Sequence, residues 1–189
     1  MNRKHLVLLA GALITYGAIV ALTMWSGGDE PKPPRSLCFG TLDERTAALI
    51  DDGQGGRVDM DEFERKGQGD YAFFRSCIAR RAGADGNATR TVYSLIMEDS
   101  KGGAGLPKGA VLLGGGGLIG WALPDRAEAQ LPTGCPSRLG STAPYITVTL
   151  SAPSQAEKKG IVDRDTAIRN AAAVVRESAL SLARISGCS

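Results

Sequence analysis

Hydrophobic positions divide the chain into an uncharged N-terminal run and a longer region of mixed polarity. Leu6 to Trp25 contains twenty residues without a charge, enough for a helix of about 30 Å, the thickness of the hydrocarbon core of a bilayer. Residues 1–5 include Arg3 and Lys4, which favour a cytoplasmic N-terminus. We therefore expect a transmembrane signal-anchor helix at 6–25, with residues 26–189 outside the cytoplasm.

A cleaved signal peptide is the alternative interpretation of the same run. Signal peptides carry an apolar region of about 7–15 residues, followed by a cleavage site with small residues. Ser26-Gly27-Gly28 provides such residues. The run from Leu6 to Trp25 is longer than a signal peptide requires, so we expect an uncleaved single-pass anchor in the cell membrane. Cleavage would instead release a secreted protein.

Beyond the anchor, composition separates a linker from a folded domain. Residues 26–37 are rich in glycine and proline, and Pro31, Pro33 and Pro34 keep such a segment extended. Residues 38–189 contain runs with the periods of strands and helices. We expect residues 38–189 to form one extracytoplasmic domain.

The clearest element of that domain is a long C-terminal helix at 163–186. Asp163 is a suitable N-cap, and Gly187 is a natural stop. Between them, apolar residues recur at steps of three and four and form one stripe: Ile168, Ala171, Val175, Ala179, Leu182 and Ile185. The stripe predicts that this helix covers one face of a sheet.

Runs of β-forming residues predict an antiparallel sheet under this helix. The expected strands are 77–81, 91–97, 110–113, 118–123 and 145–150. A short helix is expected after Thr41, with Glu44 completing a capping box. Residues 57–63 fit a strand or a helical turn, and residues 124–144 fit a Pro- and Gly-rich loop. The predicted fold class is therefore α+β.

Four cysteines beyond the anchor predict a disulfide-stapled ectodomain: Cys38, Cys77, Cys135 and Cys188. None belongs to a C-x-x-C pair, so neither a zinc knuckle nor a thioredoxin-like site is expected. Of the three possible pairings we expect the sequential one, Cys38–Cys77 with Cys135–Cys188. Each bridge would close a loop of 40–54 residues, which stabilises by about 4 kcal/mol in the chain-entropy model.

Charge and histidine content exclude several classes of function. Twenty Lys and Arg and twenty Asp and Glu follow Trp25, so the ectodomain lacks the basic surplus of a nucleic-acid-binding protein. It also lacks a polybasic run for lipid headgroups. The one histidine, His5, precedes the anchor, which leaves the ectodomain without a Ser-His-Asp site, a Cys-His site or a His-ligated zinc. We expect no cofactor.

The run Val111–Pro124 contains four consecutive glycines and invites comparison with a nucleotide-binding loop. Gly115, Gly117 and Gly120 match the G-x-G-x-x-G spacing. That motif opens a helix and has an acidic residue about twenty positions later, whereas Pro124 ends this run early and no acid stands at that distance. We expect a hairpin with a glycine turn instead.

Residues 51–62 are similar to a calcium-binding loop. On the twelve-residue template, Asp51, Asp59 and Glu62 hold positions 1, 9 and 12. Gly53 and Gly55 stand at positions 3 and 5, where the template supplies side-chain oxygens. We expect a solvated acidic turn, and a weak calcium site with Asp51, Asp59 and Glu62 as ligands is the alternative.

A run of acidic residues suggests one enzymatic alternative. Asp59, Asp61, Glu62 and Glu64 lie close together in the sequence, and paired carboxylates perform glycoside hydrolysis. A small carboxylate-dependent envelope hydrolase is therefore a second alternative. Clusters of this kind are usually exposed to solvent, so no catalytic residue is assigned.

Several short features also occur together. They are the anchor, the Gly/Pro-rich linker, Cys-Phe-Gly-Thr-Leu at 38–42, Leu-Pro-Thr-Gly-Cys at 131–135 and a terminal helix ending in Gly-Cys at 187–188. In this combination the chain resembles uncharacterised membrane-anchored or secreted proteins of actinobacteria such as Streptomyces. The resemblance implies no activity and assigns no functional residue.

These observations favour a non-enzymatic binding or interaction module at the cell envelope. Its partner would be an unidentified envelope protein or ligand, and it would contact the membrane through Leu6 to Trp25. A flat apolar surface with a polar rim would support partner binding. Two inward carboxyl groups about 5–10 Å apart would support the hydrolase.

Overall fold

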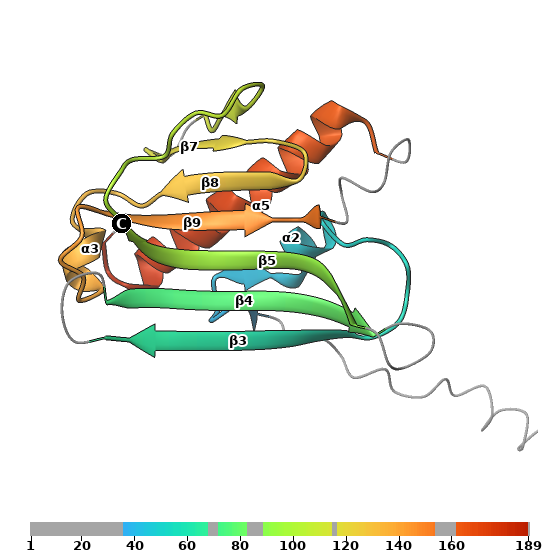
Figure 1. Cartoon of the computed structure of the whole chain (residues 1–189), viewed down its shortest axis with the longest axis horizontal. Helices are drawn as coiled ribbons and strands as arrows, with labels where there is room; N and C mark the ends of the chain where they lie inside the picture. Colours follow the sequence, from blue (N-terminus) through green and yellow to red (C-terminus); the bar gives the residue numbers. More distant parts are fainter. Residues whose placement is uncertain (1–35, 68–71, 83–88, 115–116, 154–161, 189) are drawn as a thin grey trace, which may run out of the picture. The chain divides into compact units, whose positions relative to one another are not determined.

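A seven-stranded antiparallel sheet organises the domain (Figure 1). The computed structural model describes residues 36–67, 72–82, 89–114, 117–153 and 162–188. Across the sheet, the strands follow in the order β3 (Val58–Lys66), β4 (Phe73–Ala82), β5 (Thr89–Ser100), β9 (Tyr145–Ser151), β8 (Arg126–Gln130), β7 (Ile119–Ala122) and β6 (Val111–Leu112). Every neighbouring pair is antiparallel. The edge strands are therefore β3 and β6.

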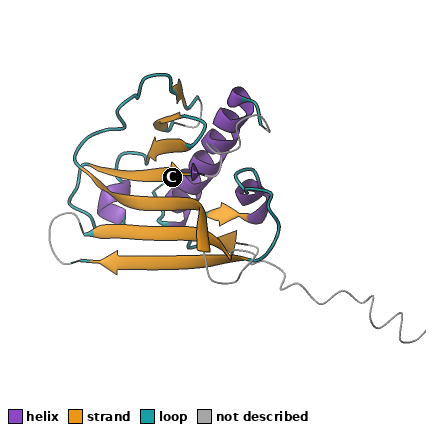
Figure 2. Ribbon diagram, turned by 45° about the vertical axis from the view of Figure 1, so that its right-hand side comes forward, coloured by secondary structure: helices purple, strands orange, loops and turns teal. Residues whose placement is uncertain are grey.

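The long helix lies on one face of this sheet. Helix α5 (Arg164–Ile185) crosses behind the strands, and the short helix α2 (Glu44–Ala48) lies on the same side (Figures 1 and 2). A small hairpin of β1 (Ser36–Leu37) and β2 (Leu42–Asp43) precedes α2. Helix α3 (Cys135–Arg138) joins β8 to β9 at one end of the sheet. The opposite sheet face carries none of the described helices.

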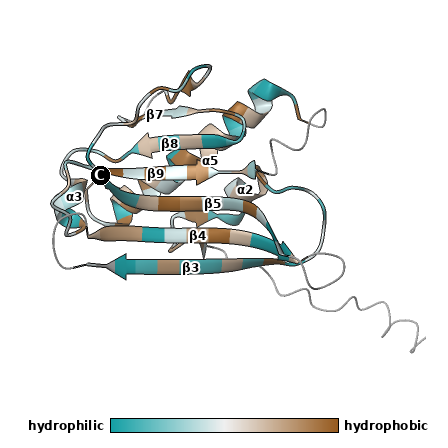
Figure 3. Cartoon of the chain, in the orientation of Figure 1, coloured by the Kyte–Doolittle hydropathy of each residue, from teal (hydrophilic) through white to brown (hydrophobic). Residues whose placement is uncertain are grey.

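The core forms between α5 and the central strands. Strand alternation points Leu95, Met97, Val148 and Leu150 toward the helix, and all four are fully buried. Hydropathy follows this arrangement, since β5 is largely hydrophobic and the edge strand β3 is more hydrophilic (Figure 3). On the helix, the buried side chains include Ala171, Val175, Ala179 and Leu182. The expected stripe is thus confirmed along most of its length.

The predicted stripe is wrong at one position, its last. Ile185 is 59 % exposed. It lies in the last turn of α5 beside Gly40, and a Cβ built on that glycine would be 3.7 Å from Ile185 Cδ1. Because Gly40 has no side chain, it does not cover Ile185 as a larger residue would.

The α+β class, the antiparallel sheet and the C-terminal helix are confirmed. For residues 57–63 the sequence allowed a strand or a helical turn, and they belong mostly to strand β3. The expected loop at 124–144 is wrong in part, because it contains β8 and α3. Strand β8 buries alanines, which are weak strand formers and gave no apolar signal.

The expected cap of the first helix is also corrected. The N-cap of α2 is Asp43, whose Oδ1 accepts the Thr46 N–H at 2.7 Å. Thr41 is buried two residues earlier, and its Oγ1 donates to the Cys38 carbonyl at 2.7 Å. Its hydroxyl therefore closes the β1–β2 turn instead of beginning the helix.

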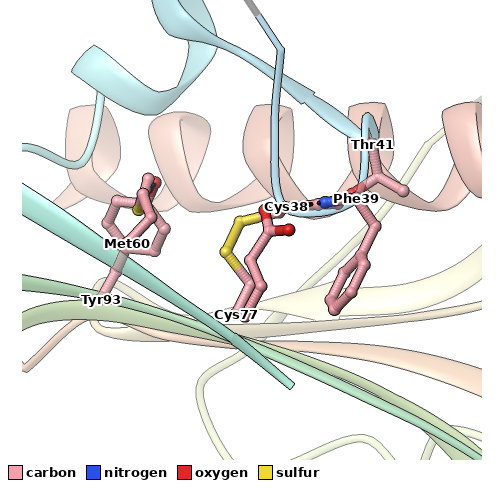
Figure 4. The surroundings of a disulfide bond; sticks show 7 residues. Cys38, Phe39, Thr41, Met60, Cys77 and Tyr93 are labelled. Carbon is pink, nitrogen blue, oxygen red and sulfur yellow. Dashed lines mark hydrogen bonds between the residues drawn. A yellow bond between two sulfur atoms is a disulfide. The ribbon is translucent and has the colours of Figure 1, made fainter. Parts of the chain in front are cut away.

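Both expected disulfides are present with the sequential pairing. Cys38–Cys77 fastens the β1–β2 turn to β4, with Phe39, Met60 and Tyr93 nearby (Figure 4). Cys135–Cys188 joins α3 to the chain three residues beyond the end of α5. No free cysteine remains among the described residues.

The prediction of a transmembrane anchor concerns residues that the structure does not describe. The predicted anchor at 6–25 and most of the linker lie there, and Ser36 and Leu37 of the expected linker form β1. Among the described helices, none combines the length and apolarity required to cross a bilayer.

Candidate functional site

The candidate calcium loop is built around an arginine. Arg81 on β4 donates Nε to Asp52 Oδ1 at 2.9 Å and pairs through Nη2 with Asp51 Oδ2 at 2.7 Å. Its Nη1 also donates to the carbonyl of Gly56 at 2.7 Å. The guanidinium thereby takes up the carboxylate and carbonyl oxygens of the loop, which are the groups that a calcium ion would require.

Asp52 is the most buried carboxylate of this loop. Its side chain is 2 % exposed, and it also accepts from Arg90. Burial acts to raise the pKa of Asp52, but the Gln54 N–H and the charges of Arg81 and Arg90 outweigh it, so the pKa lies below its ordinary value. Asp52 therefore stays ionised and holds the loop against β4.

The predicted calcium ligands do not come together. Asp59 pairs with Arg57 at 2.7 Å on the exposed strand β3, and Glu62 Oε1 accepts the Phe39 N–H at 3.0 Å. Asp51 is bound to Arg81. Within the described part of the chain, no group of three or more His, Cys, Asp or Glu residues is placed to hold a metal ion.

Strand β3 also divides the acidic run that suggested a hydrolase. Alternation places Asp59 and Asp61 on one face of the sheet and Glu62 and Glu64 on the other. Asp61 pairs with Arg80 at 2.7 Å, while Glu64 pairs with Arg75 on the helix side. These carboxylates therefore form separate ion pairs, not one acidic site.

A different pair of glutamates lies on the open face of the sheet. Glu98 on β5 stands opposite Thr147, and Glu128 on β8 stands opposite Thr149, two residues along the same strand β9. The pKa of Glu128 is raised, first by burial and then by the negative charge of Glu98. The sequence does not indicate this pair, because β8 carries no strand signal.

The strands on either side of the glycine run pair as a hairpin, as expected, while Gly115 and Gly116 lie outside the described residues. Strand β6 pairs with β7, and the Leu113 N–H donates to the Gly120 carbonyl at 3.0 Å. Gly117 has φ of 70°, which suits glycine. A Cβ on Gly120 would approach Leu113 Cδ1 to 2.7 Å, so this glycine permits close packing. A strand follows the glycines, so they do not open a phosphate-binding helix.

Exposed apolar side chains gather at this edge of the sheet. Seven large hydrophobic residues are exposed in the described structure, and four belong to the β6–β7 hairpin or the segment leading into it. We call them the hairpin surface: Leu106 (58 % exposed), Val111 (52 %), Leu112 (67 %) and Ile119 (61 %). By contrast, their neighbours Leu113 and Leu118 are buried.

Helix α5 fastens this hairpin to the domain. Arg164 Nη2 donates to the Gly109 carbonyl at 3.0 Å, and Arg176 Nη2 donates to the Gly114 carbonyl. Lys101 and Lys108 are exposed on the segment before the hairpin. The hairpin surface therefore sits on a supported element with basic residues close to it.

Comparisons with known proteins give no relative. Neither the protein-family models, nor the curated proteins, nor the solved structures contain a match to this chain.

Proposed function

We propose that the protein is a non-enzymatic interaction module of the cell envelope, displayed outside the cytoplasm on the N-terminal anchor at Leu6 to Trp25. The hairpin surface is its contact site. The two disulfides suit an oxidising compartment, where such bridges persist.

One observation carries this proposal: three exposed apolar side chains, Val111, Leu112 and Ile119, belong to an edge hairpin, and Leu106 is exposed in the segment that leads into it. Single exposed hydrophobic residues are common in proteins, but grouped ones mark interaction sites. The other edge strand, β3, instead carries charged residues such as Asp59, Asp61 and Arg65, the usual protection of a free strand edge. The two edges thus differ, and only the hairpin edge is suited to an apolar partner.

Site-specific photo-crosslinking in intact cells tests this function. Benzoyl-phenylalanine is placed at Leu112 or Ile119 of the full chain and, as a matched control, at Phe63 on β3, which is 57 % exposed. We expect adducts with an envelope component at Leu112 and Ile119, and markedly fewer at Phe63. Equal yields at all three positions would show that the hairpin surface has no partner.

The open-face glutamates favour a second candidate, the small envelope hydrolase. Glu128, whose pKa is raised by burial and by the charge of Glu98, has the property of an acid catalyst, and a second carboxyl group on the same sheet face is the partner that glycoside hydrolysis requires. Purified full-length protein is tested on chromogenic glycosides of several sugar types, with Glu128→Gln as the control. Turnover that Glu128→Gln abolishes would support the hydrolase, while equal turnover by both proteins would reject a role of Glu128.

A further inference from the structure

The free edge of β3 carries a charge pattern that is symmetric about Phe63. Strand β3 lies at the edge of the sheet opposite the hairpin (Figure 1), and no described strand pairs with its outer side. Alternation places Asp61, Phe63 and Arg65 on the open face of the sheet, and all three are exposed. An acidic and a basic residue thus stand at equal distances on either side of an exposed aromatic ring.

Strand β4 holds these three side chains in place. The ring of Phe74 lies edge-on to Phe63, with the two centroids 6.2 Å apart, and Arg65 Cζ is 5.4 Å from the centroid of the same Phe74 ring. Asp61 pairs with Arg80 at 2.7 Å but remains 59 % exposed. Because the side chains are already ordered, a partner that meets them pays less conformational entropy.

A second copy of the chain is the partner that this pattern fits. When two β3 strands pair antiparallel about a twofold axis at Phe63, each residue faces the one at the same distance on the other side of Phe63. The two Phe63 rings then meet at the axis, and Asp61 of each copy faces Arg65 of the other. Aromatic pairs and pairs of opposite charge stabilise antiparallel strands.

The carboxylates on the helix side of β3 have partners within each copy. The same register brings Glu62 opposite Glu64 of the second copy, which is a pair of like charges. Glu64 is paired with Arg75 at 2.7 Å, and Glu62 Oε1 accepts the Phe39 N–H at 3.0 Å. Arg75 therefore supplies positive charge beside these two glutamates and reduces their repulsion.

Neither sign of charge is in large excess at this edge. The four carboxylates of β3 are accompanied by Arg65 and Lys66 on the same strand. Arg57, Arg75 and Arg80 each pair with one of these carboxylates. Arg81, the remaining arginine of β4, is bound by Asp51 and Asp52. Two copies can therefore approach without collecting charges of one sign.

The charges that protect this edge from other strands favour a second copy. A charged edge strand disfavours an unrelated strand, because its charges then meet no matching residue. Twofold symmetry supplies the match for Asp61 and Arg65. A register centred on Glu62 is less suitable, since it places Glu62 against its own copy and Phe63 against Asp61.

We propose that two copies of the chain associate through their β3 strands, antiparallel and centred on Phe63, so that the two sheets join into one. The contact uses the edge opposite the hairpin surface and leaves that surface free. The joined sheet therefore carries a hairpin surface at each end, and the pair of copies can engage two partners at once.

Disulfide trapping of the full chain in mild detergent tests this register. Phe63→Cys is incubated with oxidised glutathione. Directly opposite residues lie about 4.5–5.5 Å apart between Cα atoms, which permits a disulfide. Asp59→Cys is the matched control on the same strand and face, where the side chain is 58 % exposed. In this register Asp59 lies about 26 Å from its own copy. We expect a covalent dimer from Phe63→Cys and none from Asp59→Cys.

Charge reversal tests the pairing of Asp61 with Arg65 without added cysteines. Sedimentation velocity of the full chain in detergent measures the dissociation constant of the dimer. Asp61→Arg and Arg65→Asp should each weaken association about tenfold, because two attractive pairs become repulsive. The double variant restores opposite charges and should recover most of the affinity. That recovery also shows that the losses in the single variants do not come from unfolding.

Three results would overturn the β3 contact. They are a monomer at all concentrations, a dimer that both single reversals leave unchanged, and equal trapping of Phe63→Cys and Asp59→Cys. A dimer that persists through both reversals would be held by another segment. The proposed function is judged separately, since a photo-adduct between two copies at Phe63 has twice the mass of the chain and is distinguished from adducts with another envelope component.

Discussion

Replacing Arg81 by methionine should cause a large loss of stability. Methionine keeps much of the aliphatic stem but removes the guanidinium that binds Asp51, Asp52 and the Gly56 carbonyl. The side chains of Arg81 and Asp52 are 7 % and 2 % exposed. Removing one member of so buried a pair typically costs about 3–5 kcal/mol. Asp52 retains Arg90, so we expect a loss of about 3 kcal/mol.

Arg80 supplies a matched control for this substitution. It precedes Arg81 on β4 and pairs with Asp61 at 2.7 Å, but the two side chains are 41 % and 59 % exposed. Exposed ion pairs contribute at most about 1 kcal/mol. Arg80→Met should therefore cost far less than Arg81→Met, although both remove a guanidinium from the same strand.

Urea unfolding of the full chain in mild detergent, with the disulfides intact, measures both losses. Trp121 fluorescence in a Trp25→Phe background reports the sheet. Equal free energies of unfolding for Arg81→Met and Arg80→Met would refute the view that the Arg81 network is buried and holds the loop. Adding Asp52→Asn to Arg81→Met should recover part of the loss, because the uncompensated charge is then removed.

The same network predicts a dependence on pH. The pKa of Asp52 is lower in the folded protein than its ordinary value of 3.8. The ionised form therefore stabilises the fold above pH 3.8, and this stabilisation is lost as the pH falls through the folded-state pKa. Asp52→Asn should remove this part of the acid sensitivity.

Three further predictions use other elements. Gly120→Ala should destabilise the sheet by about 2 kcal/mol, since a Cβ there overlaps its neighbours, whereas Gly114→Ala meets nothing within 4 Å and should be nearly neutral; unfolding in urea compares them. Calorimetry should show no calcium binding below millimolar concentrations, and binding that Glu62→Gln abolishes would contradict the arginine-centred loop. The Thr166 hydroxyl and N–H lower the pKa of Asp163, so the ionised cap stabilises the fold above the ordinary pKa and this stabilisation is lost at lower pH. Asp163→Asn should therefore make the free energy of unfolding less dependent on pH in the acid range. An unchanged dependence on pH would contradict the role of Asp163 as the cap.

Elements with a strong and long signal were predictable from sequence. The apolar stripe of α5 extends over about five turns, so the predicted bounds of 163–186 closely match the observed Arg164–Ile185. The alternation in Tyr145–Ser151 likewise identified β9. The cysteine pairing followed from an even count and from sequential order, and it holds in the fold.

Short elements were predicted less well because tertiary contacts define them. In β8, Ala127 and Ala129 are fully buried, but alanine alternating with polar residues gives no strand signal. The calcium-like pattern at residues 51–62 suggested the wrong partner for a related reason. Its calcium-like spacing is local, whereas its cation, Arg81, lies 29 positions after Asp52.

The hairpin surface was only partly predictable. The sequence shows an apolar run, but it does not tell that Leu112 and Ile119 are exposed while Leu113 and Leu118 are buried. That division depends on the two-residue length of β6 and on its place at the edge. The arginines near it come from 55 and 62 positions further along the chain, so only the fold reveals them.

The order of the two disulfides has a consequence for biogenesis. A chain that crosses into an oxidising compartment from its N-terminus presents Cys38 and Cys77 before either of the other cysteines. At that stage the correct partner is the sole one within reach, and the same holds for Cys135 and Cys188 once the first pair is closed. Under the proposed localisation, oxidation during translocation would therefore favour the native connectivity from the start.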